Sequence, residues 1–337
     1  MTASSPSAAA RAGANFALVK YWGKRDTALN LPAVGSISLT LADLWTETRV
    51  EFDPQLSEDE VVIDSQSRPA EARRVSACLD RLRDLAGVET RARVASHSNF
   101  PAAAGLASSA SGFAALVCAA AAALELELKP ARLSELARLG SGSAARSIFG
   151  GFVEMARGRR TDGRDSVARP LLAPADWPLE VVVAVTDPGP KPVGSTEGML
   201  HSARTSPYYS AWVKGQEADL AAARRAIAGR DFEALAAISE ASALSMHAVA
   251  MAARPGLLYW NATTLECLHH IRAMRDRGMG VFFTVDAGPQ VKAVCLPGAG
   301  GPVAAELAAV AGVKEVRRSR LGEGVVIRAA GKRARGA

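Results

Sequence analysis

The sequence predicts an α+β protein of two domains. Its 337 residues are enough for two domains of ordinary size, and nearly half of them are apolar, which favours a folded chain with a substantial core. A strand-rich stretch opens each half, from Asn15 and from Leu179, and helical patterns follow each one. The proline-rich segment RPLLAPADWP separates the halves. We therefore expect an N-terminal domain (residues 1–175), a C-terminal domain (residues 176–328) and a basic tail (residues 329–337).

The elements of the first half follow from periodicity and from helix start and stop signals. We expect a loose segment over residues 1–14 and then strands in NFALVK, GSISLTLADLWTETRVEF, VVID and ETRARVASHSNF, where apolar residues alternate or run together. PAEARRVSACLDRLRDLAG has the spacing of an amphipathic helix that ends at Gly87. FAALVCAAAAALELEL predicts a buried helix, and ARLSELARLG predicts a short helix that ends at a GSGS turn.

The second half begins with a strand in LEVVVAVTD. Long helical patterns run through residues 208–250 and 263–278, and strands follow in GVFFTVDAG, QVKAVCLP and GVVIR. Strands and helices thus alternate irregularly in both halves, and no fixed-period repeat is present. This order is typical of an α+β fold.

The formal net charge of +6 is unevenly distributed, because basic residues crowd the segment 314–337. A nucleic-acid-binding tail is one interpretation. We favour a solvated basic end, since no aromatic residues interleave with the cations as stacking partners would. A phosphorylated small substrate would also suit a basic protein.

Cysteine usage and apolar runs bear on the compartment. Cys78, Cys118, Cys267 and Cys295 lie far apart without a CxxC motif, which favours reduced, buried thiols over disulfides or a structural zinc site. The N-terminus lacks the continuous apolar run of a signal peptide. The run 112–124 is shorter than the roughly 18 to 20 residues that cross a bilayer. We expect a cytoplasmic protein without a membrane or nucleic-acid partner.

The stretch PAAAGLASSASG at residues 101–112 leads directly into the predicted Ala-rich helix. A helix N-terminus has N–H groups without intrahelical partners and a partial positive charge, so a loop of small residues there can bind phosphate. A tightly packed helix entry would use the same residue types, and the loop alone does not separate the two interpretations. No lysine follows as in a P-loop, so a phosphate here would need cations from elsewhere in the chain.

Other motifs place such cations at the ends of predicted elements. KYWGK contributes Lys20 and Lys24, GSGSAARS contributes Arg146, VGSTEG is a turn with two hydroxyls, and TVDAGPQ places Asp286 after a strand. Each motif alone also has a structural interpretation, such as surface lysines or an aspartate that organises its own turn. Together they suggest a site for a polyanionic ligand.

Five motifs, in order and across nearly the whole chain, resemble those of the diphosphomevalonate decarboxylase family of the GHMP kinase superfamily. They are KYWGKRDTALNLP, SHSNFPAAAGLASSASGFAAL, LGSGSAARSIFGGFVE, STEGM and DAGPQ. The resemblance implies a ribosomal-protein-S5-like N-terminal domain, a ferredoxin-like C-terminal domain and an active site in the cleft between them. It also implies ATP and Mg²⁺ as cofactors, mevalonate 5-diphosphate as substrate and a homodimer.

The resemblance further implies roles for individual residues. Asp286 would lie against the substrate 3-hydroxyl, Lys20 would neutralise the transferring phosphoryl group, and Arg146 would bind the substrate carboxylate. The substrate-binding residues would be Tyr21, Lys24, Arg74, Ser143, Ser195 and Thr196. The ATP-binding residues would be Pro101, Gly105, Ala107, Ser108, Ser109 and Ser111, with Ser108 also a ligand of Mg²⁺. The histidines have no motif support as catalysts, and we interpret them as structural.

The chain departs from the family pattern in three places, one of which is VDAGPQ, where Val285 and Gln290 stand for the usual Phe and Asn. Ala33, Val34 and Gly35 stand where the family has a polar pair, and Pro188 and Pro192 bound a segment that is usually charged and rich in serine. Related alternatives are a kinase that stops at the 3-phosphate, an enzyme of mevalonate 5-phosphate or of another tertiary 3-hydroxy acid, and a binding protein that has lost its chemistry. Lys20 and Asp286 together favour the decarboxylase.

Overall fold

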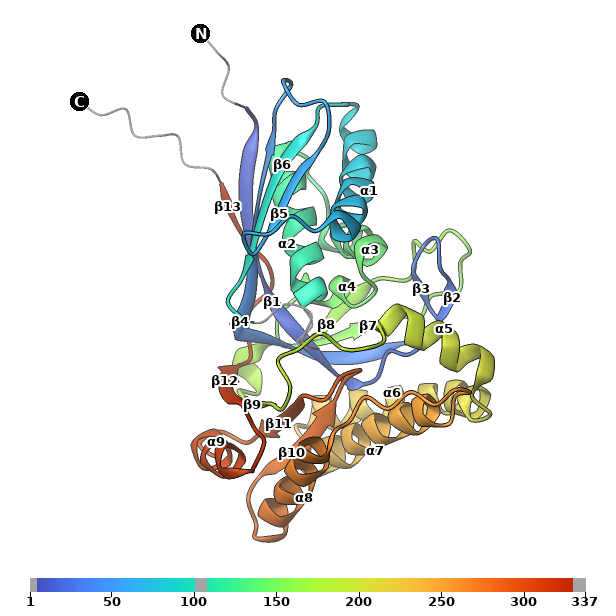
Figure 1. The fold of residues 1–337 in the computed structure, drawn as a ribbon, viewed down its shortest axis with the longest axis vertical. Helices are drawn as coiled ribbons and strands as arrows, with labels where there is room; N and C mark the ends of the chain where they lie inside the picture. The colour runs from blue at the N-terminus through green and yellow to red at the C-terminus, as the bar shows by residue number, and fades with distance from the viewer. Residues whose placement is uncertain (1–4, 101–107, 330–337) are drawn as a thin grey trace, which may run out of the picture.

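The computed structural model describes residues 5–100 and 108–329, and the predicted α+β architecture is confirmed (Figure 1). A mixed sheet has the strand order β13-β1-β4-β6-β5, with β7 paired to β4 and β8 to β7. Only β5 and β6 pair in parallel within this sheet as described. Its strands are β1 (Ser7–Val19), β4 (Ser36–Phe52), β5 (Glu60–Ile63), β6 (Ala92–Ser98), β7 (Phe152–Met155), β8 (Ala168–Leu172) and β13 (Val326–Ala329).

The first strand is longer than expected. β1 pairs antiparallel with β4 from Ser7 opposite Glu51 onward, so the expectation of a loose segment is wrong for residues 7–14. Ala8 and Ala10 are buried in the cluster that α2 (Ser108–Ala123) joins. Their small side chains allow close approach of that helix, and small residues do not give the strong apolar signal by which strands are predicted.

Helices cover one face of this sheet, as Figure 1 shows for α1, α2 and α3. The first of them begins with a proline at its first position and ends at Gly87, which has a left-handed φ of 67° that favours glycine. Residues 101–107, which precede α2, lie outside the described residues. The helices of this half besides α2 are α1 (Pro69–Ala86), α3 (Pro130–Gly140) and α4 (Ala144–Ser147).

The second sheet is antiparallel, with the order β10-β11-β9-β12. β12 (Glu315–Arg320) pairs with β9, so the first part of the basic segment is a sheet strand and not a solvated end. One sheet face packs against α8 (Ala262–Asp276) and α9 (Gly300–Ala309). The other strands are β9 (Glu180–Val185), β10 (Val281–Val285) and β11 (Val291–Cys295).

The opposite face of the second sheet packs against the first sheet. Val183 and Phe282 belong to the same buried cluster as Phe16 and Leu39. This shared core brings the end of β1 close to the end of β10, where the motif residues lie. The division at residue 175, between β8 and β9, stays a prediction, although β13 pairs with β1 in the first sheet.

The long helices of the second half complete this core. α7 (Phe232–Met251) is long and apolar enough to span a membrane by length and composition alone, but it packs here against β10, β1 and α6 as a core helix does. α5 (Ser195–Thr205) packs against α6 (Tyr209–Gly229) and α7, and the strands β2 (Lys24–Asp26) and β3 (Leu31–Pro32) lie near α5 at the right of Figure 1.

Candidate active site

A cavity of about 950 Å³ lies where the first sheet, the segment after β10, α1, α2 and α5 approach one another. Eleven of the predicted residues line it, and they come from six separate segments of the chain. These are Lys20, Tyr21, Lys24, Arg74, Ser108, Ser109, Ser143, Arg146, Ser195, Thr196 and Asp286.

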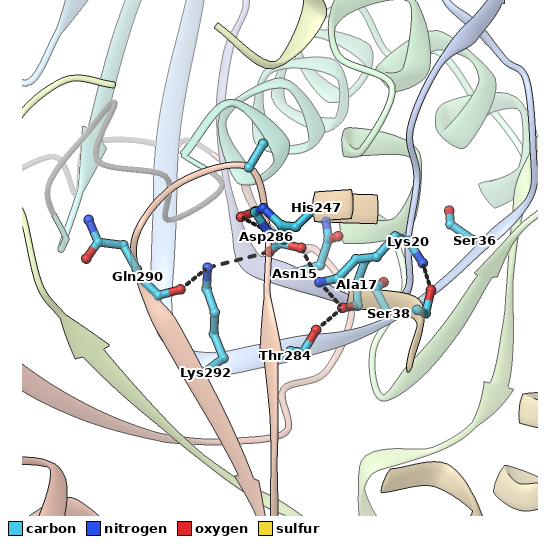
Figure 2. A network of polar contacts seen from close by, with 12 residues as sticks. Asn15, Ala17, Lys20, Ser36, Ser38, His247, Thr284, Asp286, Gln290 and Lys292 are labelled. Carbon is cyan, nitrogen blue, oxygen red and sulfur yellow. Dashed lines mark hydrogen bonds and ion pairs between the residues drawn. The ribbon is translucent and has the colours of Figure 1, made fainter. Parts of the chain in front are cut away.

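Lys20 and Asp286 form an ion pair inside this cavity (Figure 2). Lys20 follows the last residue of β1, and Asp286 follows the last residue of β10. The Lys20 ammonium donates to Asp286 Oδ1 and to the main-chain oxygen of Ala17, each at 2.7 Å. The Lys20 main-chain N–H donates to Ser242 Oγ of α7 at 3.0 Å. The main-chain oxygen of Ala17 in β1 and the Ser242 hydroxyl of α7 therefore fix Lys20 next to Asp286.

The charges around Asp286 keep its carboxylate ionised. Burial alone would raise the pKa of Asp286, but Lys20, Lys292 and Arg146 outweigh it and lower the pKa to about 2. Burial lowers the pKa of Lys20, and the interaction with Asp286 acts in the opposite direction. At neutral pH the site therefore holds a carboxylate that can accept a hydrogen bond or a proton.

Lys292 is a second lysine on Asp286 that the sequence interpretation missed. Its ammonium lies 3.7 Å from Asp286 Oδ2 and donates to the main-chain oxygen of Gln290 at 3.2 Å (Figure 2). The signal was one lysine within the apolar strand QVKAVCLP, close after the DAGPQ motif. Burial lowers the pKa of Lys292 to about 8, although Asp286 raises it.

His247 on α7 lies beside the same pair, and its imidazole ring is uncharged near neutral pH. Its Nε2 accepts from the Trp260 indole N–H at 3.0 Å and lies 3.2 Å from the main-chain oxygen of Asp286. Because an indole N–H can only donate, this nitrogen is unprotonated. Burial, and then the charge of Lys20, lower the pKa of His247 to about 3. The geometry supports a structural role.

Arg146 is held rigidly with one edge available. Its Nε and Nη2 donate to Asn15 Oδ1 at 3.1 and 3.0 Å, Nε also reaches Ser38 Oγ, and Nη1 donates to Ser36 Oγ at 2.7 Å. Among the described contacts, one N–H on each terminal nitrogen remains, which is the pair that binds a carboxylate in a bidentate manner. Burial lowers the pKa of Arg146 to about 10, so it stays a cation.

Two lysines meet hydroxyl groups at the start of α5. Lys24 donates to Thr196 Oγ1 at 3.2 Å, and Lys191 donates to Ser195 Oγ at 2.7 Å. Ser195 and Thr196 were expected in a turn, but Gly194 is a helix N-cap and both residues belong to the first helical turn. Lys191, which the sequence interpretation did not select, comes from the proline-rich segment that departs from the family pattern. It adds a cation to this end of the cavity.

Arg74 and Tyr21 approach the same end from other elements. Arg74 Nη2 donates to the main-chain oxygen of Gly140 at 2.7 Å, and its guanidinium lies 4.9 Å from the centre of the Phe113 ring. The Tyr21 hydroxyl is buried without a hydrogen-bond partner among the described residues, so it has a donor available for a ligand. A Cβ on Gly142 would lie 2.5 Å from this hydroxyl, so the glycine provides its space.

The first turn of α2 faces the cavity with Ser108 and Ser109. Ser109 Oγ lies 3.4 Å from Ser141 Oγ, and Ser141 Oγ lies 3.4 Å from Ser143 Oγ. Ser111 does not line the cavity, because it is fully buried and shares a hydrogen bond of 2.7 Å with Thr46 Oγ1. The other predicted ATP-binding residues, Pro101, Gly105 and Ala107, lie outside the described residues.

No group of three or more His, Cys, Asp or Glu side chains that could hold a metal ion occurs in residues 5–100 and 108–329. A divalent cation in this cavity would therefore take most of its oxygen ligands from phosphate groups, with one or two protein hydroxyls. Mg²⁺ beside nucleotides commonly takes phosphate and water oxygens as ligands, and a serine or threonine hydroxyl is one of its usual protein ligands. The hydroxyls at the start of α2 fit such a site.

Comparison with known proteins relates both halves of the chain to one family. Residues 12–168 match the model described as diphosphomevalonate decarboxylase-like N-terminal domain, and residues 181–299 match mevalonate 5-diphosphate decarboxylase C-terminal domain. The diphosphomevalonate decarboxylase of Candida albicans is 38% identical over 300 residues, which cover 84% of this chain and 82% of that protein.

Solved structures agree with these sequence matches. Mevalonate diphosphate decarboxylase from Staphylococcus aureus superposes with a TM-score of 0.90 at 36% identity, over 96% of this chain and 98% of that one. The structure of MDDEF in complex with MVAPP, AMPPCP and magnesium superposes with a TM-score of 0.89 at 36% identity, over 96% and 99% of the two chains. The fold that the resemblance implies is therefore confirmed.

Proposed function

The chain belongs to the diphosphomevalonate decarboxylase family, and we propose that it converts mevalonate 5-diphosphate and ATP to isopentenyl diphosphate, ADP, phosphate and CO₂. The observation that carries the proposal is the ion pair of Lys20 with Asp286, 2.7 Å apart inside the cavity that Arg146 and the first turn of α2 also line. A binding protein that had lost its chemistry would not need an ionised carboxylate held in this way.

The residues define a two-stage reaction. The Asp286 carboxylate accepts the hydrogen bond of the substrate 3-hydroxyl and then its proton, as the hydroxyl oxygen attacks the γ-phosphorus of ATP and ADP leaves. Lys20 offsets negative charge on the transferring phosphoryl group. The 3-phosphate then leaves with the C–O electron pair, and the bond between the carboxylate carbon and C2 breaks. Its electrons form the new double bond, and CO₂ is released.

Arg146 acts on the second stage. Its free guanidinium edge would bind the substrate carboxylate in a bidentate manner and hold the C–C bond in the orientation from which it breaks. The cationic groups nearby also favour departure of the phosphate. No electron-accepting cofactor is required, because phosphate is the leaving group.

ATP would bind with its phosphates at the first turn of α2, where Ser108 and Ser109 line the cavity and the helix dipole has its positive end. Ser108 would hold Mg²⁺, which neutralises phosphate charge. The related structure is a complex with MVAPP, AMPPCP and magnesium, which supports ATP and Mg²⁺ as the ligands of this chain.

The 5-diphosphate is favoured over the 5-monophosphate by the number of donors at the start of α5. Lys24 with Thr196 and Lys191 with Ser195 form two separate cation–hydroxyl pairs, and Arg74, Tyr21 and Ser143 line the same cavity. Two phosphoryl groups could each take one pair. A homodimer and a cytoplasmic location stay predictions.

Product analysis tests this function. Purified protein with Mg-ATP and mevalonate 5-diphosphate should form ADP, CO₂ and isopentenyl diphosphate in equal amounts, and Asp286→Asn should reduce the rate by about 10²–10⁴-fold. Asp276→Asn, an exposed acid at the end of α8, is the matched control and should keep the wild-type rate. ADP without CO₂ would indicate a 3-kinase, and turnover of only the 5-monophosphate would change the substrate. No product from either compound would contradict an enzymatic function.

A further inference from the structure

On the basis of the proposed function, we propose that Lys292 is a positioning residue for Asp286, which holds the carboxylate ionised and fixes its second oxygen while Lys20 binds the first. Each oxygen of this carboxylate faces its own lysine. Oδ1 accepts from Lys20 at 2.7 Å, and Oδ2 lies 3.7 Å from the Lys292 ammonium. The two lysines come from different parts of the fold, because Lys20 directly follows β1 of the first sheet and Lys292 lies on β11 of the second.

Lys292 reaches Asp286 from a fixed position. It lies opposite Thr284 in the pairing of β10 with β11, two residues before the aspartate. Its ammonium also donates to Gln290 O at 3.2 Å and lies 4.8 Å from the centre of the Phe16 ring. A buried ammonium group is costly unless it is paired, so its position beside a carboxylate indicates a specific interaction.

Lys292 does not touch the substrate. Its side chain is 0% exposed and is absent from the cavity lining, whereas Lys20 and Asp286 both line the cavity. It therefore acts through Asp286. This separates the two lysines, because Lys20 must also serve the transferring phosphoryl group. When Lys20 interacts with that group, Lys292 still supplies the charge that opposes protonation of Asp286.

Three further charged or titratable side chains lie near Asp286 on other parts of the fold, but at a greater distance from its carboxylate than Lys20 and Lys292. Only Lys20 and Lys292 form ion pairs with the carboxylate among the described residues. The more distant groups are Arg146 on α4, Lys191 in the segment before α5, and His247 on α7 beside the Asp286 main-chain oxygen.

The test is the pH dependence of kcat/KM and kcat for mevalonate 5-diphosphate in Lys292→Met. Loss of an opposite charge at this distance should move the acid limb that reports Asp286 upward by about one to three pH units. KM should stay within about twofold of wild type, because Lys292 does not contact the substrate. Lys292→Arg keeps the cation and should keep the acid limb of the wild type.

Val294→Ala is the matched control, since Val294 is buried two residues along β11 and its loss removes packing without charge. Its acid limb should remain where the wild type has it. If Lys292→Met does not fold by circular dichroism, Lys292→Gln makes the same test with a polar side chain. An unchanged acid limb in the folded variant, an equal shift in Val294→Ala, or a raised KM with unchanged kcat would each overturn the inference. Wild-type protein without products would instead refute the proposed function.

Discussion

We expect His247 to be the main cause of the decrease in the free energy of unfolding in mild acid. The perturbation is a change from about pH 7.5 to about pH 5, where a histidine of the unfolded chain binds a proton and buried His247 does not. The pKa of His247 falls from 6.5 to about 3 in the folded protein, with burial as the main cause. Because the unfolded state binds more protons across this range, the free energy of unfolding decreases as the pH falls.

The magnitude follows from the difference between the two states. Each pH unit below the unfolded pKa of 6.5 costs about 1.4 kcal/mol, so about pH 5 should cost about 2 kcal/mol. The loss should begin near the unfolded pKa and continue down to the folded one. Asp286 contributes little here, since its own pKa is lowered to about 2 and its stabilising effect is lost only in stronger acid.

Urea unfolding followed by tryptophan fluorescence measures this effect, because Trp260 contacts His247 directly. His247→Gln keeps an acceptor for the indole N–H but does not titrate. Between the two pH values it should lose about 2 kcal/mol less than wild type. His269→Gln, on the exposed side of α8, should retain the wild-type pH dependence. An equal loss in His247→Gln and wild type would refute the reasoning.

Two other substitutions test the buried ion pair of Arg83 with Asp59 and the space around the Tyr21 hydroxyl in the cavity. Arg83→Met should lower the free energy of unfolding by about 3–5 kcal/mol, measured by urea unfolding, because buried Asp59 loses its ion-pair partner. Recovery of stability in Arg83→Met with Asp59→Asn would support this cause, and a loss below about 1 kcal/mol in Arg83→Met would contradict it. Gly142→Ala places a Cβ 2.5 Å from the Tyr21 hydroxyl and should raise KM about tenfold with a smaller change in kcat. Gly215→Ala, which meets nothing within 4 Å, is its control, and equal KM values in the two variants would contradict a role for Tyr21 in binding.

Local patterns predicted most of the fold. The helix over Pro69–Ala86 has its proline and glycine signals in the expected places, and β4 and β10 follow from their apolar patterns. The prediction failed where tertiary packing decides. β1 begins at alanines whose burial depends on α2, and β12 is a charged strand that pairing with β9 holds in the sheet.

The candidate site shows the same limit. Lys20 and Asp286 stand in recognisable motifs, and the structure brings them together across 266 positions of sequence. Lys191 and Lys292 could not be distinguished from surface lysines, because their importance depends on which elements approach them. Ser111 belongs to the serine-rich motif, but it is fully buried behind Thr46, to which it is hydrogen-bonded, and does not line the cavity. A motif thus indicates residue types, whereas helix rotation and strand pairing decide which of them face a ligand.

The pairing of β13 with β1 also determines how the chain can be handled. Ala8 lies opposite Ala329, so the described ends of the polypeptide meet at one edge of the first sheet, at one end of the molecule in Figure 1. The backbone passes between the two sheets twice, once after β8 and once after β12. A short linker could close the polypeptide into a ring, and new ends could then be opened in a surface loop such as 158–164.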